Sequence, residues 1–158
     1  MYIIPGSPTR VQVTPAAKEL AEKLDAEGYF GLGQGYGRAN SISRSQLFAF
    51  AMALGFEINE GTPLDKQYQG GFIQDTAFDG RLMALICGEW LCSIGEDNLD
   101  QMTNKSAIYK LAEQYANTGF NIIAKQMAEQ SEEELLFDML MELDDMYEQS
   151  GLMNTLQE

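Results

Sequence analysis

The residues best suited to bind a phosphate group lie around a glycine-rich segment and the short run that follows it. Glycines occupy positions 31, 33, 35 and 37 of GLGQGYGR, Arg38 follows, and Ser43, Arg44 and Ser45 open an apolar run. A dinucleotide fingerprint requires Gly-x-Gly-x-x-Gly and a P-loop ends in Gly-Lys-Ser or Gly-Lys-Thr; neither spacing occurs. The glycines are better explained as a flexible loop. Phosphate contact by Arg38 and the amides around Ser43 to Ser45 stays open, because a helix N-terminus binds anions.

The chain contains no histidine, and this excludes several reaction classes. A Ser-His-Asp triad, a Cys-His pair and a histidine-ligated metal all require that side chain. Cys87 and Cys92 are too few for a four-thiolate zinc site, and their spacing is not that of a metal or redox pair, so we interpret them as buried helical residues. We expect no enzymatic activity, no cofactor and no metal. An enzyme with a carboxylate-held metal is the minor alternative, although no calcium loop is present.

Charge is distributed unevenly along the chain, which has a formal net charge of −14. Residues 1–56 hold five basic and four acidic residues, whereas residues 57–158 hold five basic and twenty acidic ones. From Gln126 to the end there are ten acidic residues and no basic one. Bulk nucleic acid repels such a chain unless it has a local basic face, and only the first third could supply one. The remainder is expected to be a solvated acidic surface or a docking surface for a basic partner.

The length of 158 residues predicts a single domain spanning residues 1–158. The first residues contain only four consecutive apolar side chains before Pro5, which is too short for a signal peptide. No apolar run approaches the roughly eighteen residues that a membrane span requires. We therefore expect a cytoplasmic protein that does not enter a membrane.

The elements that would position these residues are mostly helices. Alternation in TRVQVTP predicts a short strand with Val11 and Val13 on one side. A helix should follow, with Thr14 as its N-cap and Pro15 in its first turn, and Gly28 should end it. Further helices are predicted at about 43–56, 76–94 and 105–129, and a last one begins at Ser131. In the helix at 76–94, helical spacing predicts that Phe78, Leu82, Leu85, Ile86 and Trp90 face inward. In the helix at 105–129, it predicts one face with Ile108, Leu111, Tyr115, Gly119, Ile122 and Ile123. The fold class is mainly α: a short N-terminal strand followed by a multi-helix bundle, with an acidic helical portion over residues 75–158.

The helix from Ser43 to Phe56 is the most unusual of these elements. Ser43 and Gln46 form a capping-box pattern, and Leu47 to Phe56 contain no charged side chain. A helix that is apolar on every side must be buried on every side, either at the centre of the fold or in a dimer interface. Gly119 interrupts the helix at 105–129 and predicts a close approach of another helix.

The order of strand, helix and helix in RVQVTPAAKELAEKL and SISRSQLFAFAMALGF resembles a ribbon–helix–helix unit, here residues 1–56. In that family, strands from two protomers pair and enter the major groove of DNA. The resemblance implies a homodimer in which Arg10, Gln12 and Thr14 read bases. It also implies that Ser43, Arg44 and Ser45 contact phosphate.

A second resemblance covers roughly Ser43 to Met127. The segments LFAFAMALGF, EGTPL, GGFIQDTAFDGRLMALICGEW and IYKLAEQYANTGFNII are similar to a family of small bacterial Dnd-system-associated proteins. Such proteins are encoded beside the DNA phosphorothioation and restriction genes of antiphage defence. The resemblance implies a genomic neighbourhood and supplies no catalytic residue to transfer.

Together these observations predict a non-enzymatic accessory or regulatory protein of a DNA-modification or antiphage defence system. It would bind a protein partner of a defence complex and could contact DNA weakly through its first third. We expect the partner to meet the acidic C-terminal run at Glu132, Glu133, Asp138 and Asp145. The alternative is an acidic inhibitor or DNA mimic, which a phage could encode, because the same run could imitate the charge spacing of DNA.

Overall fold

The computed structural model describes residues 9–27 and 43–130, together with the helical positions 134, 138, 141 and 145. The described chain is mainly helical with one short two-stranded element, which confirms the predicted fold class. The chain divides into two compact units, residues 1–123 and residues 124–158, which we describe separately. Among the described residues, no helix has both the length and the apolar character that crossing a membrane would require. The prediction of a single domain is not tested by this division.

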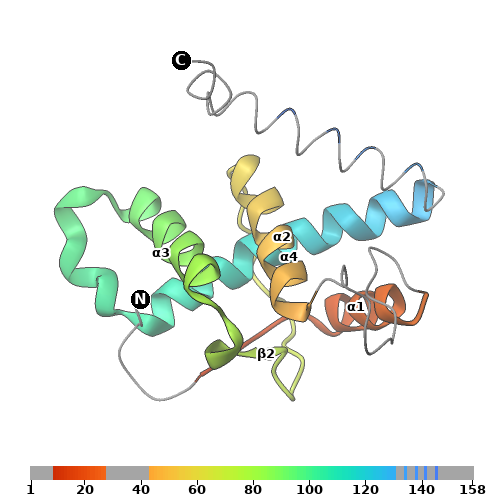
Figure 1. Cartoon of the computed structure of the whole chain (residues 1–158), viewed down its shortest axis with the longest axis horizontal. Coiled ribbons are helices and arrows are strands. Elements are labelled where there is room, and N and C mark those ends of the chain that lie inside the picture. The colour runs from red at the N-terminus through yellow and green to blue at the C-terminus, as the bar shows by residue number, and fades with distance from the viewer. Residues whose placement is uncertain are drawn as a thin grey trace. The chain divides into compact units, whose positions relative to one another are not determined.

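The first unit contains most of the described elements (Figure 1). Two-residue strands β1 and β2 and two 3-10 helices, η2 and η3, connect the longer helices. In chain order the elements are β1 (Arg10–Val11), α1 (Pro15–Glu27), α2 (Arg44–Glu57), β2 (Ile73–Gln74), η2 (Asp75–Ala77), α3 (Gly80–Ile94), η3 (Glu96–Thr103) and α4 (Lys105–Glu129).

The short strand β1 pairs antiparallel with β2 of the same chain, with Arg10 opposite Gln74 and Val11 opposite Ile73. Sequence analysis did not predict β2, because its segment is rich in turn residues. The ribbon–helix–helix resemblance implied pairing between strands of two protomers, whereas the observed pairing is internal. Burial explains the difference: Ile73 is 6% exposed, and the pairing places it beside the fully buried Val11.

The N-terminal helix α1 begins as predicted. The Oγ1 atom of Thr14 accepts a hydrogen bond from the backbone N–H of Ala17 at 3.2 Å, as an N-cap side chain does. Pro15 occupies the first helical position, where its missing N–H costs nothing. The buried face consists of Ala17, Ala21 and Leu24.

Helix α2 is the buried central helix that the sequence predicts. The side chain of Ser43 accepts from the N–H of Gln46, and the side chain of Gln46 accepts from the N–H of Ser43, which confirms the capping box. Its buried residues surround the helix: Leu47, Phe48, Ala49, Ala51, Met52, Leu54 and Gly55. Because the chain itself covers this helix, its apolar character no longer requires a second copy. The homodimer stays a prediction.

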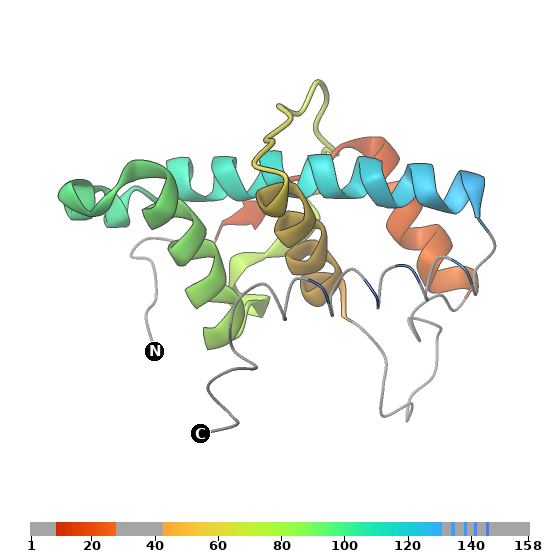
Figure 2. The ribbon, with the colours of Figure 1, turned by 90° about the horizontal axis from the view of Figure 1, so that it is seen from above.

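Two glycines allow α2 and α4 to cross at backbone contact (Figure 2). A Cβ atom at Gly119 of α4 would overlap the carbonyl oxygen of Ala51, and one at Gly55 of α2 would overlap that of Tyr115. The close approach predicted at Gly119 is therefore confirmed. Aromatic rings pack around this crossing, with the Phe56 and Tyr115 centroids 5.5 Å apart in an edge-to-face arrangement.

The segment after α2 is attached to α4 by polar groups. The backbone N–H of Thr62 lies 3.0 Å from Oγ1 of Thr118, to which it donates, and the side-chain amide of Asn117 donates to the carbonyl of Thr62 at 3.1 Å. Asn117 and Thr118 are both buried, so these bonds satisfy polar groups that would otherwise be costly to bury.

Helix α3 differs from the prediction in its start and in its register. It begins at Gly80 rather than Thr76, because Asp79 is the N-cap and accepts from the N–H groups of Arg81 and Leu82. Leu85 was predicted to face inward but is 39% exposed. The expectation that both cysteines are buried is also wrong, since Cys92 is exposed while Cys87 is buried. Tertiary packing selects the face containing Met83, Ile86 and Cys87.

Helix α4 has the predicted bounds, Lys105–Glu129. Ile108, Tyr115 and Ile123 are buried as expected, whereas Leu111 and Ile122 are only half-buried. Beyond it, the predicted capping box that begins at Ser131 lies outside the described residues. Positions 134, 138, 141 and 145 are helical and exposed.

Candidate functional site

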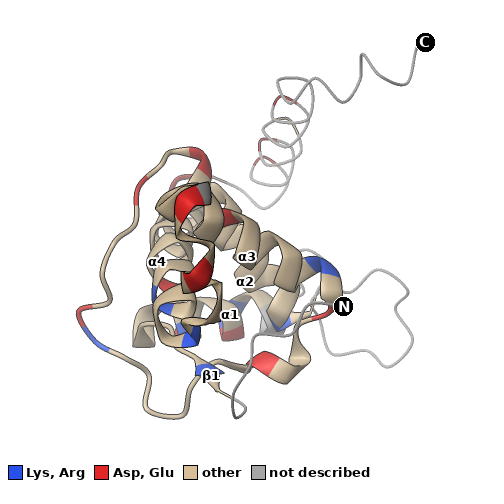
Figure 3. Cartoon of the chain, turned by 90° about the vertical axis from the view of Figure 1, so that its left-hand side faces the viewer, with Lys and Arg blue, Asp and Glu red and all other residues tan. Residues whose placement is uncertain are grey.

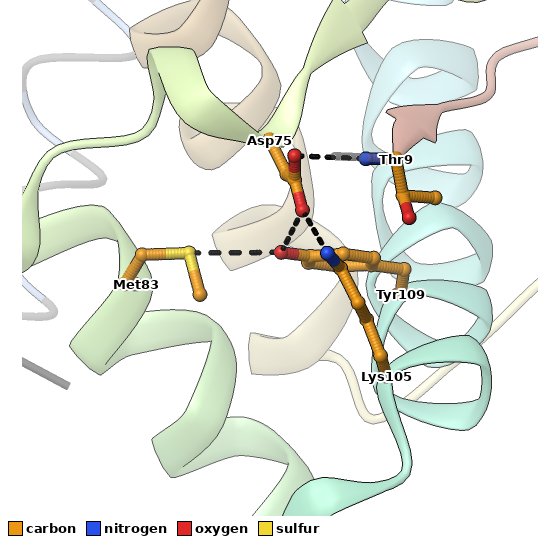
Figure 4. A network of polar contacts seen from close by, with 5 residues as sticks. All are labelled: Thr9, Asp75, Met83, Lys105 and Tyr109. Atoms are coloured by element: carbon orange, nitrogen blue, oxygen red, sulfur yellow. Dashed lines mark hydrogen bonds and ion pairs between the residues drawn. The ribbon is translucent and has the colours of Figure 1, made fainter. Parts of the chain in front are cut away.

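The most connected polar cluster in the described chain centres on Asp75 (Figure 4). One carboxylate oxygen, Oδ1, accepts from the backbone N–H of Thr9 at 2.9 Å. The other, Oδ2, lies 2.7 Å from Nζ of Lys105 and accepts from the hydroxyl of Tyr109 at 3.1 Å. The Tyr109 hydroxyl also lies 3.9 Å from the sulfur of Met83. The cluster therefore connects the chain before β1 to η2, α3 and α4.

The electrostatics of this cluster favour a structural role. Burial alone would raise the pKa of Asp75, but hydrogen bonds from Lys105 and Thr9 and the charge of Lys105 hold that pKa below its ordinary value. Burial, together with the charge of Asp75, raises the pKa of Tyr109 above its ordinary value. Asp75 is thus a stable anion and Tyr109 a stable neutral phenol. Because these shifts move both pKa values away from neutral pH, neither group is suited to act as a general acid or base there.

Two other carboxyl groups, the half-buried Glu113 and the buried Glu89, have contrasting surroundings. Glu113 on α4 accepts from the backbone N–H of Gln12 at 2.7 Å. Burial raises its pKa and the Gln12 hydrogen bond partly offsets this effect. Glu89 on α3 is 5% exposed, and neither of its oxygens has a hydrogen-bond partner. Burial raises the pKa of Glu89 to about 8, so it is mainly protonated at neutral pH.

Cationic side chains gather around one five-residue segment, Tyr68 to Phe72. Arg10 of β1 donates from Nη1 to the carbonyl oxygen of Gly70 at 3.1 Å. On α1, the Nζ atom of Lys18 lies 5.4 Å from the centroid of the Tyr68 ring. On α2, the Cζ atom of Arg44 lies 5.8 Å from the centroid of the Phe72 ring. We call Arg10, Lys18 and Arg44 the cationic cluster. Figure 3 shows the blue of Lys and Arg at β1.

The members of the cationic cluster differ in how accessible they are. Arg10 and Arg44 are exposed, whereas Lys18 is 9% exposed and forms an ion pair with Glu22 one turn along α1. The hydrogen bond and charge of Lys18 lower the pKa of Glu22, and the charge of Arg44 contributes to the same lowering. Arg44 on α2 therefore lies close enough to Glu22 on α1 for its charge to lower the pKa of that carboxyl group. Two arginines remain available for an external anion.

The segment that holds the cationic cluster is fixed to the fold by its backbone. The N–H of Tyr68 donates to the carbonyl of Val13 at 2.8 Å, and the N–H of Phe72 donates to that of Val11 at 2.8 Å. Gly71 has a φ of +67°, and a Cβ there would come within 2.7 Å of the Arg10 side chain. Only glycine suits both this conformation and this contact.

The structure brings together some of the predicted phosphate-binding and base-reading residues and separates others. Arg10 and Arg44 share the cationic cluster. Gln12 is half-buried with its N–H bonded to Glu113, and Thr14 is 8% exposed with its hydroxyl used as the cap of α1. The three predicted base readers therefore do not form one exposed row.

The remaining predicted residues occupy the turn before α2 or lie outside the described chain. Ser43 and Ser45 are at the N-terminus of α2, with their hydroxyl oxygens 2.9 Å apart. Arg38 lies outside the described residues. Sequence reasoning missed Lys18 and the segment Tyr68 to Phe72, whose signal is two aromatic residues flanking Gly70 and Gly71.

Of the predicted partner-binding residues, Asp138 and Asp145 are described, whereas Glu132 and Glu133 are not. The described positions 134, 138, 141 and 145 are all helical and exposed, and their spacing of four, three and four residues places them on one helix face. Three of these four residues are acidic: Glu134, Asp138 and Asp145. We call these three the acidic stripe. It belongs to the second unit, where Asp138 also accepts from the side-chain amide of Gln130 at 2.6 Å.

Comparison of the chain with protein-family models, with curated proteins and with solved structures finds no match. Within the described ranges, 9–27 and 43–130 with four later helical positions, no group of three or more cysteine and acidic side chains could hold a metal ion. The cationic cluster and the acidic stripe are the candidate functional surfaces of the described chain.

Proposed function

We propose that this protein is a non-enzymatic accessory protein of a DNA-modification or antiphage defence system, which acts by binding a protein partner. The observations that carry the proposal are a local cationic cluster in the first unit, which is otherwise rich in acidic residues, and an acidic helix face in the second. The first unit presents the cationic cluster, whereas the second presents the acidic stripe on an exposed helix face. Two surfaces of opposite sign suit a protein that connects a basic protein partner with DNA.

The surroundings of three carboxyl groups support a binding role rather than a catalytic one. Asp75 is neutralised by Lys105, Asp79 caps α3, and Glu113 accepts from a backbone N–H. Each has a structural partner that accounts for its position. The type of system is proposed from the resemblance of Ser43 to Met127 to the Dnd-associated proteins, with which the two charged surfaces are compatible.

The partner is expected to be a basic surface on a phosphorothioation or restriction protein encoded near this gene. Long-range attraction between such a surface and the C-terminal acidic run would speed association and weaken with salt, because the Debye length is only about 8 Å at physiological ionic strength. Binding should therefore be strongest at low salt.

Capture experiments with purified components would test the proposed partner. The tagged protein is mixed with each purified phosphorothioation and restriction protein of the source organism at low and physiological salt. A variant of the acidic stripe with Glu134→Gln, Asp138→Asn and Asp145→Asn should lose capture. The matched control replaces three exposed acidic residues of the first unit, Glu57, Asp97 and Asp100, and should retain it. Equal capture by both variants, or capture of none of these proteins by the wild type, would contradict the proposal.

An acidic inhibitor or DNA mimic is the second candidate, and the acidic stripe is the observation that favours it. Carboxylates repeated along one exposed helix face can occupy a basic groove that normally holds DNA. Competition separates the candidates: a mimic should displace duplex DNA from the captured protein, whereas an accessory protein should leave that DNA bound.

A further inference from the structure

We infer that the cationic cluster is a contact surface for the phosphate backbone of duplex DNA, and that it binds without reading base sequence. This inference rests on the DNA-binding part of the proposed function and specifies its residues and its mode. Arg10 and Arg44 supply the charge, and the segment Tyr68 to Phe72 with Lys18 holds them in place.

The contacts of the cluster explain why the two arginines could act together. They come from elements far apart in sequence, and each contacts the same segment, which is itself bonded to the strand region through Val11 and Val13. Arg10 uses one of its five N–H donors for the carbonyl oxygen of Gly70, so most of the N–H groups of its guanidinium remain available. Guanidinium groups match phosphate oxygens and can bind them through paired hydrogen bonds.

An extended polyanion fits this surface better than a small phosphate compound. Arg10 and Arg44 are exposed and are held by different parts of the segment, at Gly70 and at the Phe72 ring. A polymer with repeating phosphates can contact both at once and gains affinity by releasing its counterions. This gain matters for a chain whose net charge of −14 otherwise repels DNA.

The aromatic residues of the segment argue against a membrane as the anionic partner. Phe72 is 6% exposed, so Tyr68, which is 36% exposed with Lys18 near its ring, is the one exposed aromatic residue of the segment. The surface therefore offers little apolar area to insert between lipids. One exposed ring with a lysine near it is also a poor platform for stacking the successive bases of a single strand.

Binding without base readout follows from the positions of the other residues on this part of the chain. Base recognition needs several side chains that reach base edges in a groove. Thr14 is buried as a helix cap, and Gln12 is half-buried beside Glu113, which leaves Arg10 as the only exposed member of the three predicted readers. Arg10 and Arg44 in contact with phosphates would position the protein on DNA, but phosphate contacts do not distinguish one base sequence from another.

Fluorescence anisotropy with the full chain tests this surface. The probes are two labelled duplexes of equal length and unrelated sequence, a single strand of equal length, and vesicles containing anionic lipid, each over a series of salt concentrations. We expect binding to both duplexes with affinities within about twofold. The logarithm of the association constant should fall with the logarithm of salt with a slope of about −2, since each neutralised phosphate contributes roughly 0.9.

Variants distinguish specific contact from overall charge. Arg10→Ala and Arg44→Ala should each make the salt slope shallower by about one unit. Arg10→Lys and Arg44→Lys keep the charge and should retain most of the slope. The matched control Lys110→Ala removes an exposed cation from α4 and should leave the slope unchanged. Thermal unfolding of each variant establishes that it is folded before binding is compared.

Several results would overturn the inference. These are absence of duplex binding at low salt, an equal effect of Lys110→Ala and the arginine variants, a tenfold preference for one duplex, or preferential binding to vesicles or to the single strand. Partner capture measured on the same preparations keeps the two conclusions separate. Lost DNA binding with intact capture overturns this inference alone, whereas lost capture overturns the proposed function.

Discussion

Gly119 on α4 lies against the backbone of Ala51 on α2, where the two helices cross. A Cβ atom at position 119 would overlap the Ala51 carbonyl oxygen and lie 2.7 Å from its Cα atom. The Ala51 atoms in this clash belong to the backbone of a buried helix, and the Cβ atom would be fixed to the backbone of α4, so neither side can move aside without displacing a helix. The glycine thus sets how closely the two central helices approach.

Replacing Gly119 with Ala should therefore destabilise the protein, although Ala is the better helix former. The clash should outweigh the helix-propensity gain of about 1 kcal/mol and lower the free energy of unfolding by roughly 2–3 kcal/mol. Urea denaturation followed by circular dichroism would measure this change. Gly88→Ala on α3 is the matched control, because a Cβ there meets no atom within 4 Å, and it should raise the free energy of unfolding by about 0.5–1 kcal/mol. A Gly119→Ala protein as stable as the control would show that the helices can separate freely.

Replacing Asp75 with Asn should destabilise the protein near neutral pH. The change leaves Lys105, whose side chain is 14% exposed, without its carboxylate partner, at a cost of about 1–3 kcal/mol in the free energy of unfolding. The pKa of Asp75 is lowered in the folded state, so its contribution is present above the unfolded pKa and is lost as pH falls through the lower folded pKa. The stability difference between wild type and variant should therefore shrink in acid.

Denaturation curves from pH 7 down to about pH 2 would measure that difference. The exposed Asp97 is a suitable control, since Asp97→Asn should change stability by less than about 0.5 kcal/mol. A difference between wild type and Asp75→Asn that stays constant over this range would show that the Asp75 charge contributes nothing to stability.

Glu89 should make the protein less stable as pH rises. Its pKa changes from 4.5 for an ordinary side chain to about 8 in the folded state, so the folded protein binds more protons between these values. Stability linked to Glu89 is complete below the unfolded pKa and declines until pH passes the folded one. Glu89→Gln removes this titration and should be more stable than wild type at pH 9, by at most about 5 kcal/mol.

Chemical denaturation at pH 5 and at pH 9 would compare the two proteins. Near pH 5 the carboxyl group is mostly neutral in the folded state, so the Gln variant should gain little there. The control Glu57→Gln changes an exposed residue of α2 and should show no such dependence on pH. Equal effects of Glu89→Gln at both pH values would indicate that Glu89 is solvated in solution.

No catalytic turnover is expected from this protein. Incubation with ATP, plasmid DNA or phosphorothioated DNA, each with magnesium or manganese, should give no product by chromatography or gel electrophoresis. Product that disappears in Asp75→Asn or Asp79→Asn, with folding intact, would show that these carboxylates act on a substrate rather than only on Lys105 and the N-terminus of α3.

Local chemistry was sufficient to predict the helices and several of their ends. Ser43 and Gln46 cap α2 through atoms three residues apart, and Thr14 caps α1 in the same way, so neighbouring residues contain the whole signal. Gly119 was recognisable because glycine is unfavourable within a helix unless something approaches closely. The burial of α2 followed from its lack of any polar face.

Which residues meet across the chain depends on how the elements pack together. Strand β2 has two residues, and its partner lies more than sixty positions earlier, so no pattern of neighbouring residues predicts this strand. The register of α3 was misjudged at Leu85 because Leu82, Leu85 and Ile86 are equally apolar, and packing against other elements chooses among them. The same packing buries Glu89, against the preference of its side chain for water.

The candidate surfaces divide in the same way. The charge imbalance and the candidates Arg10 and Arg44 were recognisable without a structure, because charge and helix starts can be read along the chain. The contact of both arginines with the segment Tyr68 to Phe72, and the removal of Thr14 from the predicted row of base readers, came only from the fold. Contacts between residues distant in sequence depend on how the chain closes its loops and packs its core, and no single segment contains that information.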